Sequence, residues 1–193
     1  MQAIANIWRS AATAARDFGA DSLALAATEF AVVVPLMLVM LFGTVEVSSG
    51  VAIDRKVTMM ARTLSDLTSQ STSVGDTDMT NFFAASYGIM TPYYDSTVTS
   101  ATISELYIDP TSKVARVQWS KGSSPRSQAS VVTIPTTLAI GGTYLIFSEV
   151  SYVYTPTIGY VLKNAITLSD VAYARPRLST CVWYSPSTTC TTY

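Results

Sequence analysis

The sequence predicts an α+β protein built from one long apolar helix, a second short helix and a small antiparallel sheet. Three observations support this fold class. An apolar run near the amino terminus is long enough to cross a bilayer, a helical repeat of apolar residues continues beyond it, and the chain after Pro92 takes on the composition of β-strands. We therefore expect a single membrane span that continues into a folded head.

The predicted span lies within residues 23–47, which read LALAATEFAVVVPLMLVMLFGTVEV. No charged residue occurs from Phe30 to Val45, and with the small and apolar residues upstream the run reaches the roughly 20 residues that cross the hydrocarbon core of a bilayer. Pro35 removes one backbone hydrogen bond inside this helix, so we expect a bend or a locally opened turn there.

Apolar residues recur at steps of four and three beyond the span, which places them on one face of a continuing helix. They are Ile53, Val57, Met60, Leu64 and Leu67. A helix from about Leu25 to Leu67 would be roughly 65 Å long. We expect this face to pack on the protein's own head rather than in a coiled coil with another chain.

The head should contain a second helix and four main strands. The second helix is predicted over 77–91, capped by Asp76 or Thr77 and ended by Pro92. Strand-like composition occurs around residues 101–108, 113–119, 143–154 and 165–173. A proline-containing turn at 109–112 should join the first two strands as a hairpin, and 143–154 suits a central strand covered by the long helix.

Composition and charge exclude several classes of function. The chain carries 13% charged residues and a net charge of -1, so no basic stripe is present to neutralise nucleic-acid phosphates. It contains no histidine, the commonest general base and metal ligand, and its glycines form no phosphate-binding motif. We expect no enzyme activity and no cofactor; an enzyme of unknown chemistry would need carboxylates gathered in a deep pocket of the head.

Both cysteines, Cys181 and Cys190, lie near the carboxyl end, separated by a polar loop. A disulfide between them would contribute roughly 2.5 kcal/mol in the chain-entropy model and would require an oxidising compartment such as the periplasm. The alternative is a pair of free thiols in a frayed tail. Counting basic residues does not orient the span, because Arg55, Lys56 and Arg62 after it outnumber the basic residues before it. The predicted periplasmic head therefore rests on the cysteines and on the length of chain after the span.

Glu29 lies inside the amino-terminal end of the span, where a fully inserted carboxylate would cost on the order of 2.5–3.5 kcal/mol. One interpretation places it at the headgroup boundary or at the positive end of the helix dipole. In the other interpretation, a neighbouring chain supplies a cation that pairs with Glu29.

Several segments together resemble TadE-like pseudopilins of the tight adherence (Flp-type) pilus. The amino-terminal part of the resemblance comprises ATEFAVVVP at Ala27–Pro35 and FGTVEV at Phe42–Val47. In the head it comprises Pro135, the run GTYLIFSEVSYVYTPTIG at 142–159, and ARPR at Ala174–Arg177. The resemblance covers nearly the whole chain after residue 20 and implies a pilin-like fold.

This resemblance implies a precursor whose leader is removed by a prepilin peptidase. Cleavage between Ala24 and Leu25 would place Glu29 at the fifth mature position. Related precursors usually carry glycine before the cut, so either Ala24 is tolerated or this chain stays uncleaved. The implied organisation is a leader at 1–24, a transmembrane helix at 25–51, and a periplasmic head at 52–193 with helices at 52–67 and 77–91, a sheet at about 98–174 and a disulfide-closed tail at 175–193.

The function implied by the resemblance is that of a minor pilin or pseudopilin in biogenesis or priming of a pilus for surface attachment. The Leu25 amine of one subunit would pair with Glu29 of its neighbour, and Glu29 and Phe30 would set the registry between subunits. The implied partners are other pilins, the prepilin peptidase, the inner-membrane assembly platform and membrane lipid. The alternative is an uncleaved, single-span assembly factor that stays in the inner membrane.

Overall fold

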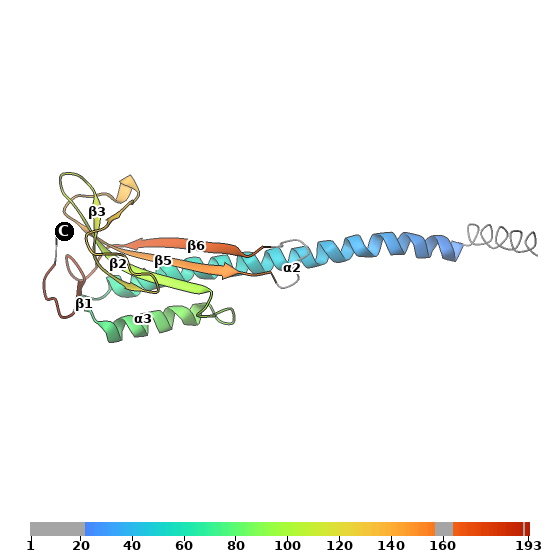
Figure 1. Ribbon diagram of the computed structural model, residues 1–193, viewed down its shortest axis with the longest axis horizontal. Helices are drawn as coiled ribbons and strands as arrows, with labels where there is room; N and C mark the ends of the chain where they lie inside the picture. Colours follow the sequence, from blue (N-terminus) through green and yellow to red (C-terminus); the bar gives the residue numbers. More distant parts are fainter. Residues whose placement is uncertain (1–21, 157–163, 191) are drawn as a thin grey trace, which may run out of the picture. The chain divides into compact units, whose positions relative to one another are not determined.

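The computed structural model describes residues 22–156, 164–190 and 192–193, and it confirms the α+β class (Figure 1). The chain divides into two compact units. The first contains the helical segment Ser22–Val47, which we call the apolar segment; the second, which we call the head, contains Ser48–Pro156 and Asn164–Tyr193. The elements are α2 (Ser22–Ser69), β1 (Ser73–Val74), α3 (Asp76–Ile89), β2 (Thr99–Ile108), β3 (Ala115–Gly122), β4 (Val131–Val132), the 3-10 helix η1 (Thr136–Leu138), β5 (Tyr144–Tyr154), β6 (Ile166–Ala174) and β7 (Trp183–Tyr184).

Helix α2 runs without interruption from Ser22 to Ser69, close to the predicted limits. Pro35 lies inside it, and the helix continues on both sides of the proline. The Thr44 hydroxyl donates a hydrogen bond of 2.8 Å to the Met40 carbonyl one turn earlier. This bond satisfies a polar group in an otherwise apolar helix, as a membrane-spanning segment requires.

The predicted apolar face of α2 packs inside the head. Its members Ile53, Val57, Met60 and Leu64 are at most 1% exposed, and Leu67 is half-buried. On the sheet side, the Ser148 hydroxyl of β5 donates a hydrogen bond of 2.6 Å to the Ala61 carbonyl. The expectation that this face packs on the protein's own head, with β5 covered by the long helix, is confirmed.

The main sheet is antiparallel and has five strands in the order β4-β3-β2-β5-β6. The predicted hairpin is present as β2–β3, where Ile108 pairs with Ala115. The Asp109 carboxylate accepts hydrogen bonds from the backbone N–H groups of Thr111 and Ser112, which fixes the turn. Strand β5 lies between β2 and β6, as its apolar sequence predicted.

Alternation along β5 separates two apolar layers. Ser148 and the residues in phase with it face α2, whereas Leu145 and Phe147 face the opposite side. On that opposite side they join a buried cluster with Leu106, Ile108, Ala115, Val117 and Val132. Ile134 and Leu138, from the segment containing η1, pack against this cluster and cover it.

Helix α3 begins one residue earlier than predicted, and neither Asp76 nor Thr77 caps it. The N-cap is Gly75, whose backbone N–H donates to the Asp78 carboxylate at 2.9 Å. Asp76 cannot fill that role because its carboxylate accepts hydrogen bonds from Tyr184 and Lys121. These two bonds, with that from Tyr184 having the larger effect, lower the pKa of Asp76 below its ordinary value.

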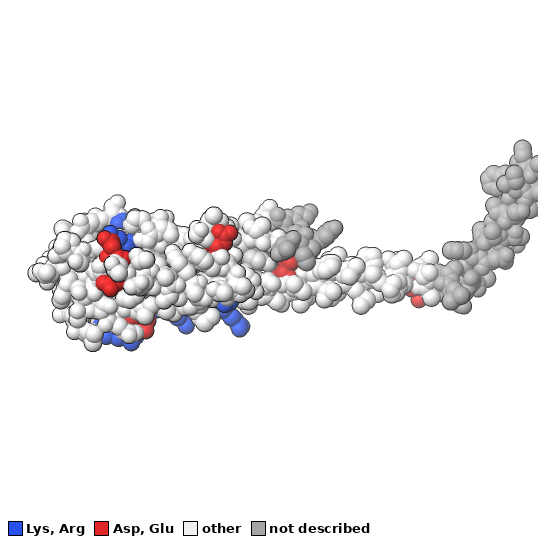
Figure 2. Space-filling view, turned by 90° about the horizontal axis from the view of Figure 1, so that it is seen from below, with Lys and Arg blue, Asp and Glu red and all other residues white. Residues whose placement is uncertain are grey.

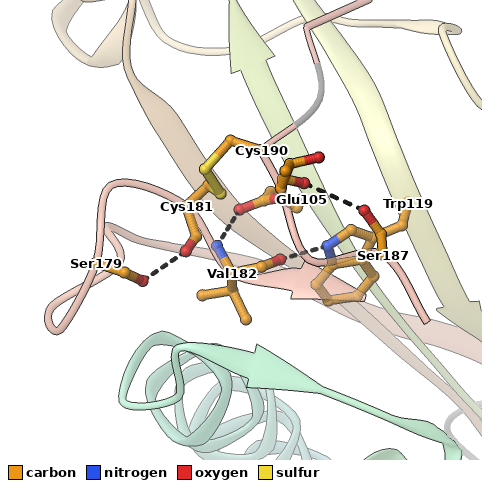
Figure 3. The surroundings of a disulfide bond; sticks show 8 residues. Glu105, Trp119, Ser179, Cys181, Val182, Ser187 and Cys190 are labelled. Carbon is orange, nitrogen blue, oxygen red and sulfur yellow. Dashed lines mark hydrogen bonds between the residues drawn. A yellow bond between two sulfur atoms is a disulfide. The ribbon is translucent and has the colours of Figure 1, made fainter. Parts of the chain in front are cut away.

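The carboxyl-terminal tail is part of the folded head. The predicted disulfide between Cys181 and Cys190 is present, with Cα atoms 5.8 Å apart (Figure 3). Cys181 and Val182 are fully buried, and β7 pairs in parallel with β1. The alternative of free thiols in a frayed tail is therefore wrong, because the tail contributes both a core residue and a strand.

Arg177 of the Arg-Pro-Arg sequence binds the start of this tail to the end of α2. The backbone N–H of Arg177 donates to the Ser69 carbonyl at 2.9 Å, which satisfies a carbonyl in the last turn of the helix. The Arg177 guanidinium also forms an ion pair with Asp66. The Arg-Pro-Arg motif, which is part of the resemblance to TadE-like pseudopilins, thus has a structural role in the head.

Candidate functional site

The apolar segment exposes large hydrophobic side chains from Phe30 to Val47. Phe30 is 70% exposed, and Figure 2 shows a helix surface with almost no charged residues. The other exposed large side chains are Val32, Val33, Leu36, Met37, Leu38, Val39, Met40, Leu41, Val45 and Val47. In the described part of the chain, α2 is the one helix that is long and apolar enough to cross a membrane. Exposure of so much apolar surface requires lipid or other helices around it.

The predicted site residues fall into two groups. Ala24 and Leu25 lie in the first turns of α2, followed by Glu29, Phe30 and Pro35 on the same helix. Glu29 and Phe30 are both exposed, so they are accessible to a neighbouring chain. Cys181 and Cys190 belong to the head and have no part in this group.

The tyrosine-rich strand β5 directs its tyrosines inward. Tyr144, Tyr152 and Tyr154 are all buried, and the Tyr152 hydroxyl donates to the Tyr93 carbonyl at 3.1 Å. These side chains are strand-forming core residues and do not form an exposed surface for contacts with another chain.

Sequence reasoning missed Glu105, an acidic side chain in β2 that is 1% exposed. Its carboxyl Oε1 accepts a hydrogen bond of 2.6 Å from the Val182 N–H, and the Trp119 indole donates 2.7 Å to the Val182 carbonyl (Figure 3). Both backbone groups of Val182 are therefore satisfied by the sheet. The sequence contained one indication that Glu105 is buried: it occupies the alternate positions of β2 that also hold the buried Ala101 and Ile103.

Burial raises the pKa of Glu105 to about 8, and the hydrogen bond from the Val182 N–H opposes this shift. The carboxyl borders a small cavity of about 120 Å³ that is also lined by Gln118, Gln128 and Ser187. Because the carboxyl already binds the tail through Val182, we assign Glu105 a role in holding the tail. In the described residues, no three His, Cys, Asp or Glu side chains gather in an arrangement that could hold a metal ion.

These features define a class of protein, an α+β head carried on one apolar amino-terminal helix that is suited to a membrane. Residues 25–64 match the family model of TadE-like proteins. The match covers residues 25–47 of the apolar segment, including Glu29, and most of the α2 face that packs in the head. The match is consistent with a TadE-like protein of Tad pilus systems, and it agrees with the resemblance in the sequence. Comparisons with curated proteins and with solved structures gave no match.

Proposed function

We propose that this protein is a minor pilin or pseudopilin that takes part in biogenesis or priming of a tight adherence pilus. The observation that supports this function is an exposed apolar helix, within the TadE-like segment, that carries Glu29 beside the exposed Phe30. Before assembly the helix anchors the protein in the inner membrane, with the head in the periplasm. During assembly the same helix packs against the helices of other pilins.

Glu29 provides the registry in this proposal. Removal of the leader after Ala24 creates a positively charged amine at Leu25. Opposite charges in apolar surroundings stabilise each other only when they are close together, so pairing of this amine with Glu29 of the adjacent subunit fixes the axial stagger. Phe30 then packs beside this pair against the neighbouring helix.

Replacing Glu29 by Gln or Ala is expected to reduce incorporation into pili by at least about tenfold, because loss of one partner leaves a charge unpaired in apolar surroundings. The measurement is the amount of the protein in sheared pili, relative to the membrane fraction, in cells that make the complete pilus machinery. Asp54→Asn is the matched control, since Asp54 is an exposed acid on the same helix within the head. Incorporation of Glu29→Gln at the wild-type level would contradict the registry proposal.

Mass spectrometry of the protein made with its prepilin peptidase is expected to show a chain that starts at Leu25. Ala24→Gly should be processed at least as completely, because glycine is the usual residue before the cut in the proteins that this sequence resembles. A chain that keeps residues 1–24 under both conditions would favour the second candidate function, an uncleaved assembly factor. The observation that favours this alternative is the alanine at position 24.

A further inference from the structure

Strand β6 forms one edge of the main sheet, and its outer edge has no strand partner in the described part of the chain. Its inner edge pairs with β5 over the whole stretch Ile166–Ala174. The Val171 N–H donates to the Asp170 carboxylate at 2.8 Å, so this N–H points away from β5. Because backbone direction alternates along a strand, Ser169 and Tyr173 direct their N–H and C=O groups to the same outer edge.

This edge lacks most of the features that normally prevent pairing with another chain. Exposed edge strands are usually short, bulged, or protected by lysine or proline. Strand β6 has nine residues and an unbroken register with β5, and it contains no lysine or proline. Its one charged residue is Asp170.

A groove of about 500 Å³ runs beside the carboxyl-terminal half of this edge. One wall is α2 between Arg62 and Leu67, and the other is Ala172–Arg175 at the end of β6. Ala172 and Ala174 are small, which leaves room between strand and helix. A groove between an edge strand and a helix is the arrangement in which proteins bind an extended peptide by strand addition.

The charges in the groove are mainly positive. Arg62, Arg175 and Arg177 line it, with Asp66 as the one acidic residue. Asp66 already pairs with Arg177. No ion pair found in the described residues involves Arg62 or Arg175, and both side chains belong to exposed residues. Two guanidinium groups are thus available to bind carboxylates.

A second copy of β6 fits this edge poorly. Asp170 is the central residue of Ile166–Ala174, so symmetric antiparallel pairing of two copies would place two Asp170 carboxylates opposite each other. Like charges directly opposite are destabilising in a sheet. The two free arginines would also have no acidic partner on the second β6.

We propose that the groove between β6 and α2 binds an extended segment of another protein that carries carboxylate side chains. The segment adds as a sixth strand along the outer edge of β6, and Arg62 and Arg175 bind its carboxylates. Backbone hydrogen bonds to β6 provide affinity that depends little on sequence, and the arginines select acidic segments. This inference concerns the head alone and does not depend on leader cleavage or on Glu29.

The test uses the full chain in detergent micelles and a fluorescein-labelled, end-capped nonapeptide that alternates valine and glutamate. Fluorescence anisotropy is expected to show binding at least about tenfold tighter than that of a matched valine–lysine peptide. Arg62→Glu combined with Arg175→Glu should remove this preference. Arg55→Glu is the matched control, because Arg55 is an exposed arginine two turns earlier on α2 and outside the groove.

Val171→Pro tests the strand addition itself. Proline is tolerated on an edge strand where the N–H does not bond to the neighbouring strand, and at Val171 the substitution removes only the bond to the Asp170 carboxylate. The head should therefore stay folded by circular dichroism while peptide binding is lost. The proposal is overturned if the glutamate and lysine peptides bind equally well, or if the double charge reversal leaves affinity for the glutamate peptide unchanged. Concentration-dependent dimerisation that competes with the peptide would assign the edge to a second copy instead and would also overturn it.

Discussion

Leu64→Ala is expected to lower the free energy of unfolding of the head by about 2–5 kcal/mol, whereas Leu36→Ala should change it by less than about 0.5 kcal/mol. Both substitutions remove the same atoms from the same helix. Leu64 is fully buried in the head, while Leu36 is 63% exposed on the apolar segment. The difference arises because only the first substitution leaves a cavity between α2 and the sheet.

Urea denaturation of the full chain in detergent provides the measurement, with tryptophan fluorescence as the signal because Trp119 and Trp183 both lie in the head. A change in midpoint without a change in slope would show that stability, rather than the unfolded state, is affected. Equal destabilisation by the two variants would contradict the distinction between the α2 face packed in the head and the exposed apolar segment.

Glu105→Gln is expected to remove a pH dependence of stability between about pH 4.5 and pH 8. Burial raises the pKa of Glu105 to about 8, so the folded head binds this proton more tightly than the unfolded chain does. The contribution of the neutral carboxyl is complete below the unfolded-state pKa and is lost as the pH rises to about 8. Because one pKa unit corresponds to about 1.4 kcal/mol, the loss is of the order of a few kcal/mol.

Glutamine keeps a carbonyl that can accept the Val182 N–H but cannot ionise. The variant should therefore have a nearly flat stability profile in this window and exceed the wild type in stability at pH 8. Glu105→Leu is the control, since it leaves the Val182 N–H unsatisfied and should be destabilised at every pH. Thermal melts of the full chain from pH 5 to pH 8.5 measure the profile. If the stability of Glu105→Gln changed with pH as steeply as that of the wild type, the pH dependence would arise from other groups.

The sequence was sufficient to predict elements that depend on local pattern. Helix α2 follows from the absence of charge between Phe30 and Val45 and from the apolar repeat of Ile53 to Leu64. The β2–β3 hairpin follows from Asp109 and its proline-containing turn. In each of these elements the determining residues lie within a few positions of one another.

Features that depend on distant partners were missed. Asp76 or Thr77 was expected to cap α3, but the cap is Gly75, and the Asp76 carboxylate is bound by Tyr184 from far along the chain. The two-residue strands β1, β4 and β7 are too short to show any alternation. The burial of Glu105 could not be predicted locally, because its partner, the Val182 N–H, lies 77 residues away.

Completion of the head during biosynthesis depends on the carboxyl-terminal tail. Strand β7, the disulfide and the hydrogen bonds to Val182 all come from residues that follow the five main strands in the chain. A nascent chain that stops before residue 181 therefore leaves Glu105 and Trp119 without the backbone that they bind. Completion of the fold must wait until these late residues are released and oxidised, so truncated products differ from finished ones in a way that quality-control proteases can recognise.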